Sequence, residues 1–334
     1  MPNKKTARCE VAILVDAETG ARRAAGHFVP DRNSVEAYVL NALRASYGNV
    51  VMVPFTCDIA RTISELRALR PRIVFNLTEW VDGDRALDAA IAGLLDLLKL
   101  RYTGSGPDGM RLARDKALSK NIVSGLGVAV PRHFVLDSSS RVRNPGLAYP
   151  LIVKPQFGDG SDEVHGNSVV KSEREFRARV RALRLRLREP LICEEFIAGS
   201  DLYVALLGNA PDVMSPVELV IGGKGAAAPQ MATYRLKNDG AFRTKWRIRW
   251  LPAKLSAVAL KNIAQASCGI FRALKLRDYA RIDYRLTSDG RIVFIEANAN
   301  PDLHPHAMGI DRCFVGVKHA DVIRRIVEAA RRRR

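Results

Sequence analysis

The chain has 334 residues, enough for two or three packed domains, and 47% of them are hydrophobic, which suffices for sizeable cores. No apolar run approaches the ~20 residues that a membrane-spanning helix needs, so a transmembrane protein is excluded. The net charge of +18 at pH 7 suggests an acidic partner, but the arginines are spread along the chain with few aromatic residues among them, so we favour solvated helix faces over nucleic-acid binding.

Basic residues and then a very short apolar run open the sequence. The run is too short for a secretory signal and is predicted to be a first strand. The cysteines are scattered, odd in number and without a C-x-x-C pair, which is typical of reduced thiols in a cytoplasmic protein. They are Cys9, Cys57, Cys193, Cys268 and Cys313.

Strands and helices alternate over the first hundred residues. Strands are predicted at residues 10–16, 50–54 and 72–76. Helices are predicted at residues 34–45, with Ser34 as N-cap, 59–69 and 85–98. This alternation predicts a parallel-sheet domain, in which ligands bind beyond the carboxyl ends of the strands. The polar residues there are Asn76, Glu79, Asp82 and Asp84.

The rest of the chain mixes the same two kinds of element. Strands are predicted at residues 131–136, 151–155 and 191–196, and within 205–221. Helices are predicted at residues 113–128, 172–188, 256–274 and 318–330. The polar, basic residues 231–250 are predicted to form a long loop that closes over a ligand.

Residues 279–303 carry the most informative pattern of the chain. Asp289-Gly290 separates two apolar-rich runs, which predicts a β-hairpin with a two-residue turn. That register places Asp283 directly opposite Glu296, on one face of the hairpin.

The same register places Arg281 opposite Asn298, so four polar side chains emerge together. Two facing carboxylates repel each other unless a cation lies between them. Oxygen ligands from Asp283, Glu296 and Asn298 suit Mg²⁺ that is shared with phosphate oxygens. A solvated hairpin face with scattered charges is the alternative, and we favour the metal and phosphate interpretation because Arg281 lies beside the acids.

The R-x-D…E-x-N-x-x-P pattern of this hairpin resembles the metal motif of ATP-grasp ligases similar to D-alanine–D-alanine ligase. Further stretches resemble the family in the same order: VFN (74–76) with YTGS (102–105), DK (115–116), LIVKP (151–155), EEFIAGSDL (194–202) and Y-x-x-K (234–237). The resemblance covers residues 72 to 330. It implies an α/β and α+β chain of ATP-grasp fold, with an N-terminal Rossmann-like domain (1–108), a central subdomain (109–203) and a C-terminal subdomain (204–334).

The resemblance also implies the cofactors and the residues that bind them. Asp283, Glu296 and Asn298 would hold one or two Mg²⁺ ions, with Mn²⁺ as an alternative. Arg281 would face an acyl phosphate, and Lys237 would grip the terminal phosphate of ATP. The implied ATP-binding residues are Lys116, Lys154, Gly160, Ser161, Glu194 (adenine amino group), Glu195, Phe196, Ile197, Asp201 (ribose hydroxyls), Lys237 and Phe294.

Three positions depart from the D-alanine ligases. Asp302 stands where the family has a glycine, Ala307 stands where it has a serine, and Glu18 is the nearest counterpart of the family's N-terminal glutamate. We therefore predict an ATP-dependent carboxylate–amine ligase that acts on amino acids or small peptides. His304 and His306 either contact the amine substrate or lie on a Pro-rich rim.

Two alternatives are a true D-alanine–D-alanine ligase and a nucleotide-binding regulatory protein without ligase turnover. The expected partners are small-molecule carboxylate and amine substrates, without a membrane. A homodimer is a further prediction.

Overall fold

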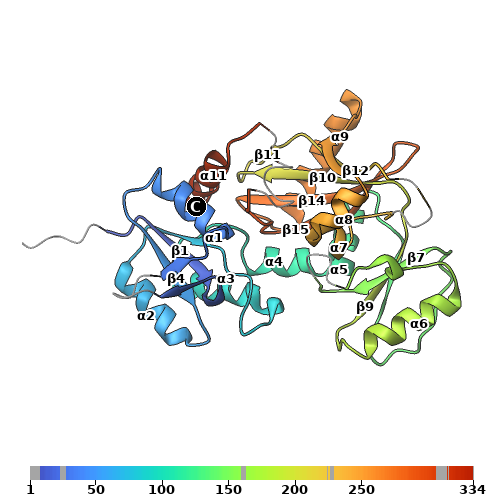
Figure 1. Ribbon diagram of the computed structural model, residues 1–334, viewed down its shortest axis with the longest axis horizontal. Coiled ribbons are helices and arrows are strands. Elements are labelled where there is room, and N and C mark those ends of the chain that lie inside the picture. The colour runs from blue at the N-terminus through green and yellow to red at the C-terminus, as the bar shows by residue number, and fades with distance from the viewer. Residues whose placement is uncertain are drawn as a thin grey trace, which may run out of the picture.

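Figure 1 shows a computed structural model of the chain, in which three sheets form three neighbouring units. The structure describes residues 8–22, 28–158, 163–223, 225, 229–305, 314 and 316–333. Within these residues no helix is both long and apolar enough to cross a lipid bilayer.

The N-terminal unit is the parallel domain that the sequence predicts. Its sheet has the order β4 (Val50–Phe55), β1 (Val11–Asp16), β5 (Ile73–Asn76). Every residue of β1 is buried, as expected for a central parallel strand that is covered on both faces. The helices are α1 (Val35–Arg44), α2 (Ile59–Leu69) and α3 (Asp88–Leu97), which a 3-10 turn (Arg85–Leu87) precedes.

One local feature of this unit was predicted from the sequence and another was not. Ser34 caps α1 as predicted, because its hydroxyl accepts a hydrogen bond from the Ala37 backbone amide. A small hairpin, β2 (Gly20–Arg22) with β3 (Phe28–Pro30), was not predicted, and each of its strands has only three residues. A 3-10 turn (Ala17–Thr19) connects it to β1.

The central unit is a four-stranded antiparallel sheet with α6 (Glu173–Arg184) packed on it (Figure 1). Its order is β6 (His133–Leu136), β9 (Leu191–Glu195), β7 (Leu151–Pro155), β8 (Val169–Val170), and a 3-10 turn (Gly166–Ser168) precedes β8. Two helices lead into this sheet, α4 (Pro107–Arg114) and α5 (Lys116–Ser124).

The predicted helix at 113–128 is wrong at both ends. Asp115 has an extended backbone, ends α4 and caps α5, since its carboxylate accepts hydrogen bonds from the amides of Ala117 and Leu118. The chain therefore turns at Asp115, and Lys116 becomes the first residue of a new helix.

The third sheet has the order β13 (Ile248–Pro252), β12 (Val217–Ile221), β10 (Ser200–Leu207), β14 (Tyr279–Leu286), β15 (Ile292–Asn298), and β11 (Asp212–Val213) pairs with β10. The boundary predicted after residue 203 falls inside β10, which pairs only within this sheet among the described strands. Helix α9 (Ala257–Ala273) packs on this sheet, and α11 (His319–Arg332) packs between the sheet and the N-terminal unit.

The long loop predicted at residues 231–250 is wrong. The segment instead forms α7 (Tyr234–Asn238), α8 (Gly240–Lys245) and the edge strand β13. Thr233 and Asp239 start the two helices as N-caps, through hydrogen bonds to the amides of Leu236 and Phe242. Residues 234–252 therefore form two short helices and a strand, and the helices begin at N-caps that hydrophobic periodicity alone did not reveal.

The hairpin of β14 and β15 does not have the predicted turn. Thr287 and Arg291 close the connection, because the Thr287 amide donates to the Arg291 carbonyl oxygen at 2.9 Å. The Gly290 amide donates to the Thr287 carbonyl oxygen, also at 2.9 Å, and Gly290 has φ of +82°. Such a left-handed residue is readily supplied by glycine, so Gly290 ends a longer turn instead of filling a two-residue one.

A β-bulge restores the pairing that the sequence predicts. Near the turn, Tyr284 pairs with Phe294, one residue away from the predicted register. An extra residue, Ile295, then enters β15, so that Asp283 faces Glu296 as predicted.

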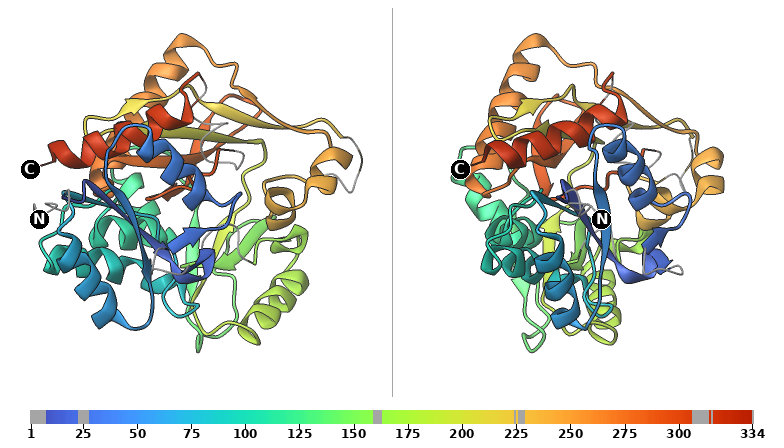
Figure 2. Two further views of the ribbon diagram at one scale, coloured as in Figure 1. Left: turned by 60° about the vertical axis from the view of Figure 1, so that its left-hand side comes forward. Right: turned by 90° about the vertical axis from the view of Figure 1, so that its left-hand side faces the viewer.

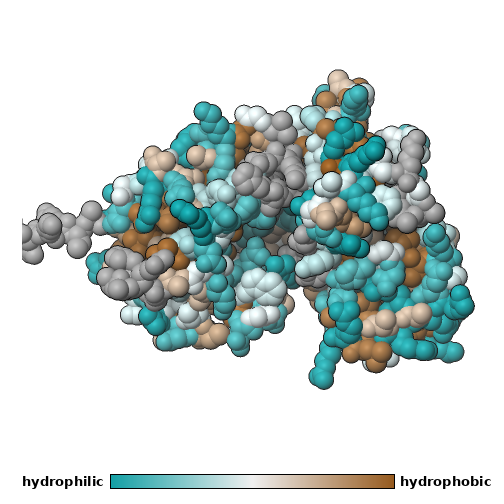
Figure 3. All heavy atoms as spheres, viewed as in Figure 1, coloured by the Kyte–Doolittle hydropathy of each residue, from teal (hydrophilic) through white to brown (hydrophobic). Residues whose placement is uncertain are grey.

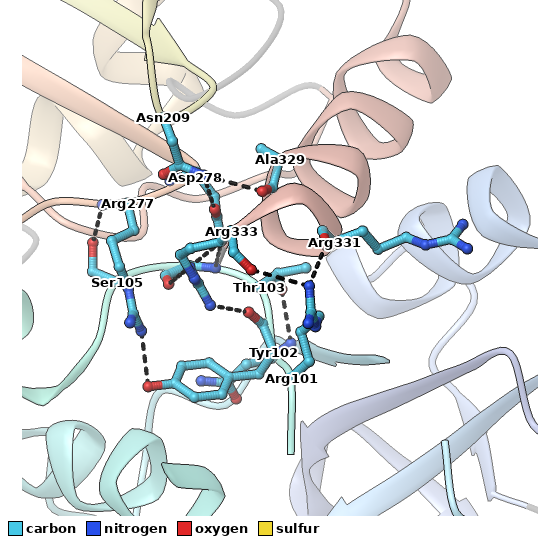
Figure 4. A network of polar contacts seen from close by, with 12 residues as sticks. Arg101, Tyr102, Thr103, Ser105, Asn209, Arg277, Asp278, Ala329, Arg331 and Arg333 are labelled. Carbon is cyan, nitrogen blue, oxygen red and sulfur yellow. Dashed lines mark hydrogen bonds and ion pairs between the residues drawn. The ribbon is translucent and has the colours of Figure 1, made fainter. Parts of the chain in front are cut away.

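One buried carboxylate binds the N-terminal unit, the third sheet and the residue that follows α11 to one another (Figure 4). Asp278, which precedes β14, is fully buried and accepts hydrogen bonds from the Gly104 amide, the Asn209 side chain and the Arg333 guanidinium, each at 2.8 Å. Arg333 also donates to the Tyr102 carbonyl oxygen at 2.7 Å. The tail that follows α11 is thereby bound to both the N-terminal unit and the third sheet, and Figure 2 shows α11 lying alongside α1.

We predict that Arg333→Met lowers the free energy of unfolding by about 2–4 kcal/mol, because it leaves the buried Asp278 carboxylate without its cation. Arg332→Met is the matched control, since Arg332 is exposed on the neighbouring position and should change stability by less than about 0.5 kcal/mol. Urea denaturation of both variants measures the difference. Equal stabilities would show that Arg333 does not hold the tail.

Candidate active site

A cleft of about 820 Å³, counting the space at its mouth, lies between the central sheet and the third sheet. Its walls come from β7 and β9 on one side and from β10, β14 and β15 on the other. Seen from the side shown in Figure 3, the outline of the molecule is hollowed between the N-terminal unit and the lobe of β7, β9 and α6. A concave site at the contact between two units, with a few charged groups among apolar walls, is where small-molecule ligands usually bind.

A buried cluster of one carboxylate and two ammonium groups forms the floor of the cleft. The Glu194 carboxylate on β9 lies 2.8 Å from Lys120 Nζ on α5 and 3.2 Å from Lys154 Nζ on β7. All three side chains are at most 6% exposed. Lys120 also donates to the Ile295 carbonyl oxygen at 2.6 Å, which fixes the ammonium beside the bulge of β15.

The pKa shifts in this cluster follow from burial and from mutual attraction. Burial raises the pKa of Glu194, but the charges of Lys120 and Lys154 and their hydrogen bonds outweigh it and lower the value to about 2. Burial lowers the pKa of Lys120 to about 8, although Glu194 opposes the shift. Burial also lowers the pKa of Lys154, but Glu194 and Glu296 outweigh burial and raise it. At neutral pH the cluster therefore carries one negative and two positive charges.

Lys116 enters the same cleft from the first turn of α5. Its ammonium donates to the carbonyl oxygens of Gly158 and Gln156, at the end of β7. The Gln156 side chain in turn donates to Asp115 at 2.7 Å, the residue that caps α5. The helix cap and the end of the strand thus position Lys116 jointly.

The polar face of the hairpin holds an ion pair that the sequence did not predict. Arg281 and Asp283 lie two residues apart on β14, and the guanidinium contacts the carboxylate at 2.7 and 2.9 Å. Burial raises the pKa of Asp283, while Arg281 opposes the shift and the nearby Glu296 adds to it. The guanidinium also lies 5.5 Å from the ring of Tyr203, so Arg281 is bound to Asp283 and does not extend freely into the cleft.

Glu296, which faces Asp283 across the hairpin, is surrounded by the lysines of the cleft. Burial raises its pKa, but Lys154, Lys116 and Lys237 lower it to about 2, with a further contribution from Lys120. Glu296 is therefore ionised at neutral pH.

The oxygen donors of this face fit a hard divalent cation. In the strand register Asp283 stands opposite Glu296. Asn298 stands opposite Arg281, which places a third oxygen donor on the same face. Within the described part of the chain, no group of three or more His, Cys, Asp and Glu side chains could hold a metal by itself. A site with two carboxylates and one amide suits Mg²⁺, which commonly takes its remaining ligands from water and phosphate.

The far end of the cleft is apolar and follows β9. Phe196 and Ile197 line it together with Met231, and the Glu195 side chain turns outward to Arg132, whose Nε lies 2.7 Å from the carboxylate. This alternation of Glu194 inward and Glu195 outward is the ordinary geometry of a strand.

Three of the residues predicted to bind ATP already have partners within the protein. The Glu194 carboxylate, predicted to meet the adenine amino group, is paired with Lys120 and Lys154. The Asp201 carboxylate is bound to Arg285 at 2.9 Å and to the Ala232 amide at 2.7 Å. Phe294 is fully buried in the core beside Tyr284, because the bulge presents Ile295 to the cleft in its place.

The remaining predicted residues fall in several places. Lys237, on α7, lines the cleft. Gly160, Ser161, His306 and Ala307 lie outside the described residues. His304 contacts the Asn33 carbonyl oxygen at 3.0 Å and stacks edge-on against Tyr38, at the contact with the N-terminal unit.

At the carboxyl end of β1, Asp16 accepts hydrogen bonds from the amides of Glu79 and Trp80. Burial raises its pKa to about 6, although these bonds oppose the shift. Asn76 is buried and binds Thr78, and Glu79 pairs with Arg85. Asn76 and Glu79, two of the polar residues predicted at this edge, therefore have partners within the N-terminal unit.

Sequence reasoning missed two buried cations, Arg285, which lines the cleft, and Lys120, which pairs with Glu194. Lys120 follows Lys116 by four residues, so both lie on one face of α5, and this spacing was a usable signal. Arg285 follows Asp283 by two residues on β14 and so shares its face of the strand, which was a second usable signal.

Comparisons with known proteins identify the family and the fold of the chain. A family model described as D-ala D-ala ligase C-terminus matches residues 122–328. The chain is 29% identical to an uncharacterised protein, y4sG, of Sinorhizobium fredii, over 78% of this chain and 75% of that protein. It is also 29% identical to a D-alanine–D-alanine ligase of Bordetella petrii, over 81% of this chain and 79% of the relative.

Among solved structures, the D-alanine–D-alanine ligase of Bacillus anthracis in complex with ATP has a similar fold, with a TM-score of 0.70 and 18% identity. The likeness covers 96% of this chain and 97% of that one. The predicted ATP-grasp fold is thereby confirmed.

We predict that Glu194→Gln lowers the free energy of unfolding by about 3–5 kcal/mol, because two lysines lose the carboxylate that neutralises them in the interior. Glu195→Gln is the control, since this neighbour pairs with an exposed arginine and should cost no more than about 1 kcal/mol. Urea denaturation at pH 7 measures both.

The same pair of proteins tests the charge of Glu194. Its pKa is about 2 in the folded chain against an ordinary 4.5, so its stabilisation is present above pH 4.5 and is lost as the pH falls toward 2. The stability difference between wild type and Glu194→Gln should therefore shrink as the pH falls below 4.5. A difference that stays constant down to the acid limit of folding would contradict the assignment.

Proposed function

The chain belongs to the D-alanine–D-alanine ligase family and is an ATP-dependent ligase, and from this premise we propose that it joins a carboxylate to an amine through an acyl phosphate. The observation that carries the proposal is the convergence of Lys116, Lys154 and Lys237 on the ionised Glu296 in one cleft. Three cations beside an acid form a site for a triphosphate with its counter-ion, because phosphate oxygens need neutralising charge.

In this proposal the apolar end of the cleft, with Phe196 and Ile197, receives adenine, and Asp201 receives the ribose. Lys116 and Lys154 then neutralise the phosphates at the floor. Lys237 grips the terminal phosphate from α7, which leaves that phosphate at the polar face of the hairpin.

Asp283, Glu296 and Asn298 would hold one or two Mg²⁺ ions, which when bound supply charge stabilisation to the transferring phosphoryl group. Arg281 holds the Asp283 carboxylate in place, which supports the ligand set from within β14. The first substrate's carboxylate attacks the γ-phosphorus, the bond to the bridging oxygen breaks and ADP leaves. The amine then attacks the acyl carbon and displaces phosphate.

The substrates proposed are amino acids or small peptides. Asp302 stands where D-alanine ligases have a glycine, and its carboxylate accepts a hydrogen bond from the His304 amide at 2.8 Å. A carboxylate at this position changes the charge near the acyl end of the site, which favours substrates other than two D-alanines. Cytoplasmic location and assembly as a homodimer stay predictions from the sequence.

A second candidate is a true D-alanine–D-alanine ligase, which the names of the curated relatives favour. The two candidates differ in the amine and carboxylate that the enzyme accepts, and not in the use of ATP.

We predict that Glu296→Gln lowers kcat for ADP release at least ~100-fold, because the carboxylate would stabilise charge that develops during transfer. The measurement is ADP release with Mg²⁺ and ATP. Asp289→Asn is the control, since it removes an exposed acid from the turn of the same hairpin and should leave the rate unchanged. A Glu296→Gln enzyme with wild-type turnover would contradict the site.

A matrix of acids and amines separates the two candidate reactions. We predict that ADP release needs an amino acid or small peptide other than D-alanine as one substrate. ADP release that depends on D-alanine alone, together with formation of the dipeptide by mass spectrometry, would establish the second candidate instead.

A further inference from the structure

A buried arginine lies at the sugar end of the cleft without any role in the chemistry described above. Arg285 on β14 is 4% exposed and lines the cleft. Its donors reach four groups: the carbonyl oxygens of Ile197 and Gly199, the Gln230 carbonyl oxygen, and the Asp201 carboxylate. An arginine that is buried with all these bonds is a fixed scaffold, because its planar fork has a single geometry that satisfies them.

The pairing with Asp201 is built into the sheet. Asp201 on β10 and Arg285 on β14 are direct partners in the antiparallel register, so their side chains lie on one face. Asp201 Oδ1 lies 2.9 Å from Arg285, and Oδ2 accepts from the Ala232 amide at 2.7 Å. A carboxylate has about four acceptor positions, so two stay available toward the cleft.

The same pair also anchors the chain that leads to Lys237. Arg285 holds the Gln230 carbonyl oxygen at 3.0 Å, and Asp201 holds the Ala232 amide. Residues 230–232 run directly into α7, which carries Lys237. The pair also lies between the cleft and a second cavity beside β12, of about 500 Å³ counting the space at its mouth, since both residues line both spaces.

We propose that Arg285 is a positioning residue for the nucleotide: it fixes Asp201 so that the carboxylate meets the ribose hydroxyls, and it fixes the loop at residues 197–199 that borders the base. The inference rests on the proposed ATP site. Arg285 would act on Asp201 through its charge as well as by fixing its position. A free carboxylate near a triphosphate would repel it, whereas a carboxylate neutralised by Arg285 keeps its acceptors for hydroxyl groups without that penalty.

The test compares the affinity for ATP with the affinity for 2′-deoxyATP, measured by calorimetry with Mg²⁺ and without acid or amine substrates. The proteins are wild type, Arg285→Met, Arg285→Lys, Asp201→Asn and the Arg285→Met/Asp201→Asn double variant. Arg249→Met is the matched control, because Arg249 is exposed on β13 of the same sheet. Circular dichroism and thermal unfolding establish that each protein is folded.

The expected result is a preference of wild type and of Arg249→Met for ATP of about 10-fold, the effect of roughly one charge-assisted hydrogen bond. Arg285→Met and Asp201→Asn should both reduce this preference to less than about 2-fold, and the double variant should reduce it no further, because the two residues act as one unit. Arg285→Lys should behave like Arg285→Met, since a single ammonium cannot span the four acceptors.

A folded Arg285 variant that weakens both nucleotides equally and keeps the preference would overturn the proposal and leave Arg285 a purely structural role. A wild type without preference for the 2′-hydroxyl would overturn it as well, because Asp201 would not meet the ribose. If Arg285→Met does not fold, Arg285→Lys and Asp201→Asn decide by the same ratio. Wild type that binds neither nucleotide would instead refute the proposed ATP site itself.

Discussion

The structure depends on the neutralisation of one buried carboxylate by two buried lysines. Glu194 comes from β9, Lys154 from β7 and Lys120 from α5, so the cluster joins the central sheet to the helix that precedes it. Lys120 also binds the bulge of β15, which connects the cluster to the third sheet. Burying these charges is unfavourable individually, and their mutual attraction is what makes a charged floor of the cleft stable before any ligand arrives. Charges held in this way need little rearrangement when phosphate binds, which is the condition for electrostatic catalysis.

The second requirement is that the sheets keep their places relative to one another. Asp278 and the tail of α11 meet that requirement at the opposite end of β14 from the hairpin turn. β14 thus runs from the interdomain contact at Asp278, past Arg281 and Asp283, to Arg285 in the wall of the cleft. One strand therefore carries both the contact that orients the N-terminal unit and the residues of the site, so a shift of the first would displace the second.

Sequence reasoning predicted much of this arrangement for identifiable reasons. Continuous apolar runs such as β1 and serine N-caps such as Ser34 are local signals, and the structure agrees with both. The pairing of Asp283 with Glu296 was also predicted, but it arises from a longer turn and a compensating bulge at Ile295. The bulge leaves no periodic mark, because it inserts one residue into residues 292–295, a stretch of β15 that is apolar at every position.

What sequence reasoning missed depends on partners that are distant in the chain. Asp115 interrupts a helical pattern because its carboxylate caps the next helix and binds Gln156, which lies 41 residues away. The spacing from Asp283 places Arg285 on the polar face of β14, but its partner is known only once the strand register sets Asp201 of β10 opposite it. The folded state also changes the meaning of Glu194, since the motif that suggests an adenine contact does not reveal that two lysines occupy the carboxylate.

The ion pairs of the cleft differ in one respect that bears on the metal. Glu194 has Lys120 and Lys154, Asp201 has Arg285 and Asp283 has Arg281, each on a neighbouring element or the same strand. The pKa of Glu296 is lowered by Lys154, which Glu296 shares with Glu194, and by Lys116 and Lys237, and the proposed function directs all three lysines toward phosphate. When those lysines turn to a triphosphate, Glu296 loses part of its compensating charge while more negative charge enters the cleft. Under the proposed function, a divalent cation that arrives with the nucleotide would restore the balance where the strand register brings Asp283 beside Glu296, so nucleotide and metal should bind cooperatively.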